Sequence, residues 1–169
     1  MPSLYDMSIP LFLHALTNQL AILHKAESHC LDNNIPLSTL LEARLAPDMQ
    51  PLPFQIQGIS NTSKNSAVRV AGVEVESWPD DETTFPQLYA RIERTIAFLE
   101  TVDSSAFEGK EDAEVVIKTG AAFGDLRFTG LTYLQNFALP NFFFHQTVSY
   151  ALLRHQGIPL GKFDYLGKV

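Results

Sequence analysis

The chain has 169 residues, of which 46% are hydrophobic and 18% are charged, and its formal net charge at pH 7 is -7. This composition is typical of one globular domain with its own hydrophobic core, which we expect to span residues 1–169. The sequence has no lysine and arginine cluster, which excludes a surface that neutralises nucleic-acid phosphates. Cys30 is the only cysteine, so an internal disulfide is excluded, and no segment predicts a membrane span. We therefore expect a cytoplasmic protein with neither nucleic acid nor membrane as a partner.

Hydrophobic residues at three- and four-residue spacing predict two long helices in the first half of the chain. The first runs from residue 9 to about 33, with Ser8 as its N-cap. A short helix over 38–45 and a proline-rich loop are expected next. The second long helix, 51–71, should end at Gly72, because glycine is common at helix C-termini.

An acidic loop, 73–83, contains the only tryptophan, Trp78, and precedes the third long helix. Thr84 and Gln87 form a capping box at the start of that helix. Its apolar residues share one face, and its charged residues, Arg91 among them, are expected on another face. A loop of about a dozen residues lets the second and third helices run parallel, which implies a crossover connection.

Two short segments, 115–118 and 126–128, flank the glycine-rich turn 120–124 and predict a β-hairpin. Thr129 is expected to cap a short helix that follows the hairpin. Pro140 should interrupt that helix, because proline has no N–H group to donate.

The fourth long helix should then run to about His155, and the tail, 158–169, should pack over the bundle as a loop. Four long helices with one small hairpin before the last predict an all-α fold, a four-helix bundle.

Several motifs resemble one bacterial branch of the DinB/YfiT-like superfamily, a branch known as a domain of unknown function. They are LLEARLAPDM (40–49), PLPFQ (51–55), FEG (107–109), LPNFFFH (139–145) and GIPLGK (157–162), spread over nearly the whole chain. The resemblance implies a four-helix bundle that is usually dimeric. In the wider superfamily, several members are thiol-dependent transferases or isomerases, and others are described as hydrolases.

The resemblance also implies a metal site in many members, formed by three histidines, two of them four residues apart on the last helix. Here His145 matches the second histidine of that pair, and Asn141 occupies the position of the first. The ligand from the second helix falls near Gln55, which is again an amide. We therefore expect no resident cofactor, with a zinc or nickel ion held at His145 as the alternative.

His145 and Asn141 lie on one helix face, which is expected to point into the bundle. In one interpretation His145 is a pocket base or metal ligand, Asn141 orients it, and Gln55 with Tyr150 or Asn61 shapes the cleft. In the other, His145 is a core histidine whose ring nitrogens are satisfied by Asn141 or by a backbone carbonyl.

Other polar and aromatic segments have simpler interpretations. The polar middle of the second helix either lines a cleft or is solvated, with small residues that permit close helix packing. We expect Asp80, Asp81 and Glu82 to form a solvated acidic loop, and Cys30 to be a buried small residue. The run 142–144 is phenylalanine all round the helix, which predicts burial by the tail or by a dimer partner.

Two functions remain. The first is a metal-free, homodimeric module that binds a small molecule or acts in a stress response. The alternative is a DinB-like enzyme, a thiol-dependent transferase or hydrolase, that uses a pocket around His145. The sequence leaves open whether the protein is an enzyme.

Overall fold

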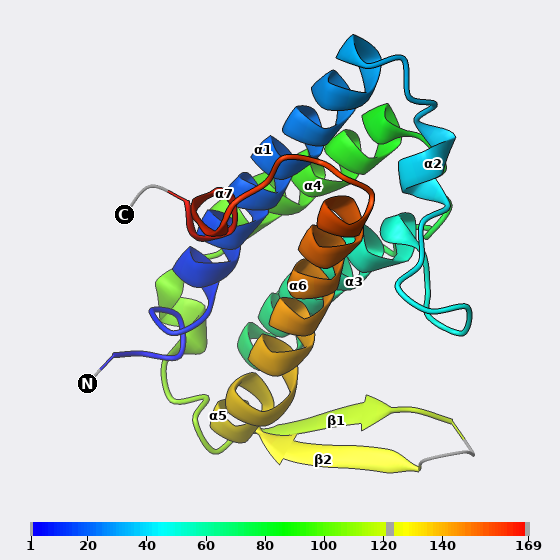
Figure 1. Cartoon of the computed structure of the whole chain (residues 1–169). Helices are drawn as coiled ribbons and strands as arrows, with labels where there is room; N and C mark the ends of the chain where they lie inside the picture. The colour runs from blue at the N-terminus through cyan, green and yellow to red at the C-terminus, as the bar shows by residue number, and fades with distance from the viewer. Residues whose placement is uncertain (1, 121–123, 168–169) are drawn as a thin grey trace.

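In the part of the chain that the computed structural model describes, residues 2–120 and 124–167, four long helices form a bundle (Figure 1). They are α1 (Ile9–Asp32), α3 (Leu52–Ser66), α4 (Phe85–Glu100) and α6 (Leu139–His155). α1 and α6 run in one direction and α3 and α4 in the other, so the predicted parallel pair and its crossover are confirmed. α3 packs against both α4 and α6, and this position decides which side chains meet it.

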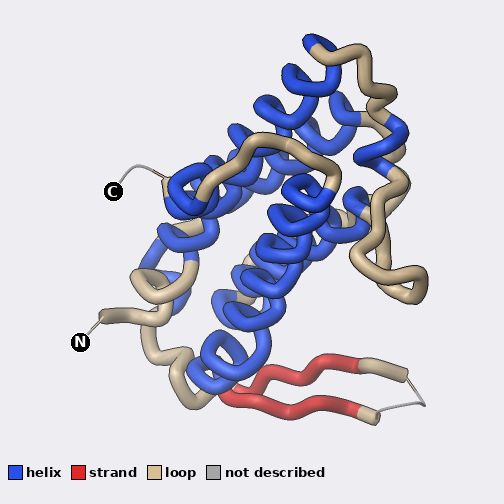
Figure 2. Tube along the Cα trace, viewed as in Figure 1, coloured by secondary structure: helices blue, strands red, loops and turns tan. Residues whose placement is uncertain are grey.

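Short elements connect the long helices, and Figure 2 shows that the strands lie apart from the bundle at one end. The connecting elements are α2 (Ser38–Leu41), β1 (Glu114–Lys118), β2 (Asp125–Thr129) and α5 (Gly130–Tyr133), and α7 (Lys162–Leu166) follows the last long helix. A 3-10 turn spans Ser104–Phe107. β1 and β2 pair antiparallel with Val116 opposite Arg127, which confirms the hairpin. Part of its predicted turn, residues 121–123, lies outside the described residues.

Local capping signals were good guides to most helix ends. Thr84 and Gln87 form the predicted capping box, in which the Gln87 side chain accepts from the Thr84 N–H at 3.0 Å. α3 continues through a π-helical turn, Ala67–Ala71, and ends at Gly72, whose φ of 73° suits glycine. Ser8 does not cap α1, because its hydroxyl donates to the Leu4 carbonyl oxygen at 2.6 Å.

The predicted break at Pro140 is wrong. The chain stays helical from Gly130 to His155, because a π-helical turn, Leu134–Ala138, directly precedes α6. A π-helical turn has a wider hydrogen-bonding pattern, so the missing proline N–H and the bulk of its ring disrupt the ladder less. The hydrogen-bonding pattern therefore changes just before Pro140, and the helix continues instead of ending there.

The core lies where the four helices meet. Phe12 of α1 and Phe142 of α6 have ring centroids 4.9 Å apart, and both side chains are fully buried. Cys30 is also buried, as expected, and its burial raises the pKa of the thiol. A buried polar contact crosses the same interface, where Gln19 donates to the Ser149 hydroxyl at 2.9 Å.

The tail packs over the bundle as predicted, but it does so as a helix. α7 lies across α1 (Figure 1), and Lys25 pairs with Asp164 at 3.1 Å. The tail does not bury the whole phenylalanine run, because Phe144 is 56% exposed, and burial of this run by a dimer partner stays a prediction. Among the described helices, none is both long enough and apolar enough to cross a membrane.

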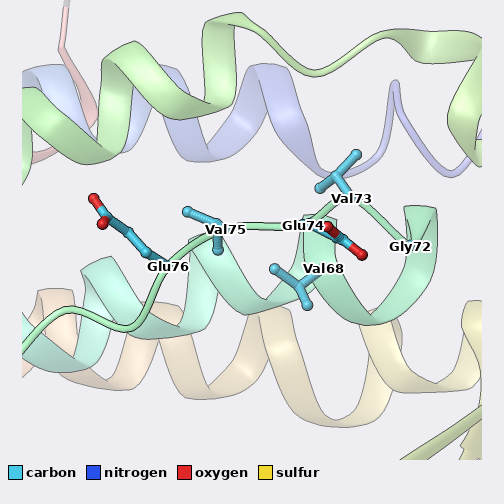
Figure 3. Close-up of a pocket in the computed structure, with 6 residues that line it drawn as sticks. All are labelled: Val68, Gly72, Val73, Glu74, Val75 and Glu76. Atoms are coloured by element: carbon cyan, nitrogen blue, oxygen red, sulfur yellow. The ribbon is translucent and has the colours of Figure 1, made fainter.

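The crossover loop, residues 73–84, runs back along α3. Figure 3 shows Val73 to Glu76 passing beside Val68 of the π-helical turn that continues α3. Further along the loop, Asn61 donates to Asp80 at 3.0 Å and Gln57 donates to Glu82 at 3.0 Å. Successive loop residues therefore contact α3 residues closer and closer to its N-terminus.

Candidate functional site

A chain of three polar groups links the start of α3 to His145 on α6. The Gln55 amide nitrogen donates to the Gln50 carbonyl oxygen at 3.0 Å, so the amide oxygen is the atom that faces His145. That oxygen lies 2.8 Å from Nδ1 of the imidazole. An amide oxygen only accepts hydrogen bonds, so Nδ1 carries the proton, and in the neutral ring Nε2 keeps a lone pair.

Gly58 allows the imidazole to sit directly on α3. A Cβ atom at this position would lie 2.6 Å from Cγ of His145, closer than any packed side chain can approach. Glycine lowers helix stability by about 1 kcal/mol relative to alanine, so its presence in mid-helix needs a packing reason. The close approach of the His145 ring is that reason.

Two exposed aromatic rings flank His145. Phe54 and Phe144 are 44% and 56% exposed, and each meets the imidazole edge-on, at centroid distances of 5.8 and 5.3 Å. No described residue hydrogen-bonds Nε2, and this atom is not sealed from solvent. Burial of the ring lowers the pKa of His145, which favours the neutral form near pH 7. The site therefore offers a lone pair on a ring that two exposed aromatic side chains contact.

The other predicted site residues are not gathered around this ring. Asn141 donates to the Thr62 hydroxyl at 2.7 Å, so Gln55 and not Asn141 orients His145. Tyr150 makes an edge-on contact with Tyr165 of α7, at 6.0 Å, on another face of α6. Asn61 belongs to a separate cluster on the α4 side of α3, where it binds Asp80.

That second cluster surrounds Arg91, which the sequence pattern placed on a different helix face from the apolar residues. Its side chain is buried at 4% exposure. Its guanidinium donates to five groups, each within 2.9 Å: the Ser60 hydroxyl, the Asn61 amide oxygen, the Pro79 carbonyl oxygen, and the Asp80 and Glu82 carboxylates. Arg91 thus ties the crossover loop to both α3 and α4.

Comparison with known proteins shows which family this chain belongs to. A family model described as a domain of unknown function, DUF1993, matches residues 4–166. The chain belongs to the DUF1993 family. A crystal structure of a DinB family member protein from Shewanella denitrificans has 32% sequence identity and a TM-score of 0.90, over 98% of this chain and 93% of that chain. The DUF1993 chain is therefore DinB-like, while no curated protein matches it.

The DinB-like fold implies a metal site, but the donors in this DUF1993 chain do not fit one. His145 supplies one nitrogen, the Gln55 oxygen is directed at Nδ1, and Asn141 is a weak amide donor. A zinc site needs at least three protein ligands. Within residues 2–120 and 124–167, no three histidine, cysteine or acidic side chains are close enough to hold a metal ion.

The Arg91 cluster corrects two expectations about this DUF1993 chain. The acidic loop is not simply solvated, because Asp80 and Glu82 pair with Arg91 at 2.8 Å each. The polar middle of α3 is largely buried, and it packs closely against its neighbours, as the small side chains suggested. Its buried polar residues are Ser60, Thr62, Ser63, Lys64 and Ser66. The sequence feature that could have predicted this cluster is the group of acidic residues next to the single tryptophan, followed by a helix that carries an arginine.

Proposed function

We propose that this protein is a metal-free module that binds a small molecule at His145. One observation carries the proposal: the hydrogen bonds from Gln50 through Gln55 assign the proton to Nδ1 and leave Nε2 as an open acceptor. Phe54 and Phe144, which contact the imidazole edge-on and are exposed, supply apolar contact area beside that acceptor. Ligand sites commonly combine apolar walls with a few placed polar groups.

The chemistry of the site selects a ligand with one hydrogen-bond donor on an aromatic or otherwise apolar body. The donor bonds to Nε2, and the body contacts the two phenylalanine rings. Because the imidazole is neutral, its charge attracts neither a cationic nor an anionic ligand. A neutral phenol-like or amide-like molecule therefore fits best.

A matched pair of probes tests this proposal. Phenol and toluene have similar shape, but only phenol donates a hydrogen bond. In NMR titrations of the isotope-labelled protein, we expect phenol to bind with about three- to tenfold higher affinity than toluene and to shift the His145 ring signals. His145→Phe should remove this preference, and His155→Phe, at an exposed position of the same helix, should keep it. Equal binding of both probes to the unaltered protein would refute the proposal.

The second candidate function is thiol-dependent transfer with His145 as general base, and the unprotonated Nε2 is the observation that favours it. Nε2 would take the proton of a thiol, and the resulting thiolate would attack the chlorine-bearing carbon of an aryl chloride, forming a C–S bond while the C–Cl bond breaks and chloride leaves. Glutathione with chlorodinitrobenzene provides the assay. A rate that disappears in His145→Phe supports the enzyme, and a rate equal to that without protein leaves the binding module.

We further propose that the protein is a cytoplasmic homodimer, because exposed apolar side chains such as Leu31 and Phe163 offer contact surface to a second copy. Analytical ultracentrifugation tests the dimer. A mass near 18.8 kDa, that of one chain, would rule it out.

A further inference from the structure

Lys64 is a buried lysine that has no carboxylate partner. It lies in α3 at 6% exposure, and no described residue hydrogen-bonds or pairs with its Nζ. The Nζ atom lies 4.5 Å from the centre of the Trp78 ring. The side chain lines a cavity of about 430 Å³ between α3 and the crossover loop. Buried lysines are almost always paired, so an unpaired amine that lines a cavity is unusual.

Three cations meet around Trp78. The Arg91 and Arg94 guanidinium carbons lie 5.7 and 4.4 Å from the centre of the same ring. Burial, followed by repulsion from Arg91 and Arg94, lowers the pKa of Lys64, although the Asp80 carboxylate acts in the opposite direction. The carboxylates of Asp80 and Glu82 are already engaged by Arg91, so they compensate Lys64 only in part.

The amine can be reached from solvent. A second hollow of about 620 Å³ lies beside the first, and Figure 3 shows the residues that line it. Val68, Val75 and Glu76 line both hollows, so the two form a continuous depression along the crossover loop. Its volume is ample for a molecule of a few heavy atoms, since a cavity of about 150 Å³ holds benzene.

We propose that Lys64 is a nucleophilic amine that forms an imine with small aldehydes entering this cavity. The Nζ lone pair attacks the carbonyl carbon and forms a C–N bond, and a proton moves from nitrogen to oxygen. The carbinolamine then loses water, which carries away the carbonyl oxygen and both amine protons, and a C=N bond remains. A lysine that is desolvated and adjacent to other cations is suited to this reaction. The site is separate from His145 and does not depend on its role.

Reductive alkylation with propanal and cyanoborohydride near pH 7 tests the proposal, because the hydride traps any imine as a secondary amine. Peptide mapping by mass spectrometry gives the initial rate at each lysine. We expect Lys64 to react several-fold faster than the exposed Lys118 and Lys162, because its lowered pKa leaves a larger share of the amine neutral near pH 7. The difference in labelling rate should disappear in urea, because in the unfolded chain all lysines have similar surroundings.

Two variants separate this proposal from simple accessibility. Arg94→Gln removes an exposed neighbouring cation and should slow labelling of Lys64 several-fold, while Arg127→Gln, on the hairpin, should change nothing. Labelling of Lys64 no faster than of Lys118 would overturn the proposal. Fast labelling that Arg94→Gln leaves unchanged would overturn it as well. His145→Phe should leave the labelling intact, which keeps this test independent of ligand binding at His145.

Discussion

His145 and Arg91 reach α3 from opposite sides, His145 from α6 and Arg91 from α4, and their surroundings differ in kind. Arg91 is an ion with every donor direction used, and its partners come from α3 and the crossover loop. His145 is half-buried, has one hydrogen bond, and keeps one nitrogen without a hydrogen bond to any described residue, and two exposed aromatic rings contact its imidazole. A saturated, buried network holds segments together, whereas an unsaturated, accessible group is available to a ligand.

The largest expected effect comes from breaking the Arg91 network. Arg91→Met should lower the free energy of unfolding by about 3 kcal/mol, because the largely buried Glu82 carboxylate loses its compensating positive charge and keeps only the neutral Gln57 amide as a partner. Urea denaturation measures the loss, and hydrogen exchange should show faster opening of residues 73–84. Arg94→Met is the matched control, since its ion pair with Glu76 is exposed and should contribute under about 0.5 kcal/mol. Equal losses in the two variants would mean that Arg91 does not anchor the loop.

A smaller effect is expected from adding a methyl group at Gly58, where the His145 ring contacts α3. Gly58→Ala improves helix propensity by about 1 kcal/mol, but the added methyl group meets the imidazole. We expect a net loss of about 1–2 kcal/mol in the free energy of unfolding, together with displacement of the ring from Gln55. Thermal or urea unfolding gives the stability, and Asn65→Ala in the same helix serves as a control that should be neutral or stabilising. A more stable Gly58→Ala protein would show that the ring does not rest on α3.

The smallest effect concerns pH. The folded-state pKa of His145 lies below its unfolded value of about 6.5, so the unfolded chain binds more protons between the two values. The contribution of His145 to stability is therefore complete above about pH 6.5 and is lost as pH falls through the folded pKa. His145→Gln should reduce the difference in unfolding midpoint between about pH 7 and pH 5. A difference as large as in the unaltered protein would assign the acid sensitivity to other groups.

The contrast also explains which features could be predicted from sequence. Helix periodicity, the Thr84 capping box and the hairpin are local patterns, and they were confirmed. His145 and Gln55 were paired through motif resemblance, and the structure brings them together. The choice of Asn141 as the orienting group was wrong, because residues four apart share a face without having to touch, and Thr62 of α3 was the nearer partner.

Arg91 could not be placed by the same patterns. A charged residue beside an apolar stripe normally lies in solvent, and hydrophobic periodicity does not record that a loop folds back to cover it. Its carboxylate partners lie 9 and 11 residues away, across a helix start, and its α3 partners lie 30 and 31 residues away. The sequence also could not show whether the tail covers Phe144, because that depends on how a distant segment packs, and the ring is 56% exposed.

The most direct measurement of the central claim is the protonation state of the His145 ring by long-range ¹H–¹⁵N correlation NMR. Gln55 accepts from Nδ1, so near pH 7 we predict a neutral ring with a protonated Nδ1 and an unprotonated Nε2. The Nε2 signal should respond to protonation only below about pH 6.5. A proton on Nε2, or a charged ring at pH 7, would contradict the assignment of Nε2 as the open acceptor and with it the proposed binding site.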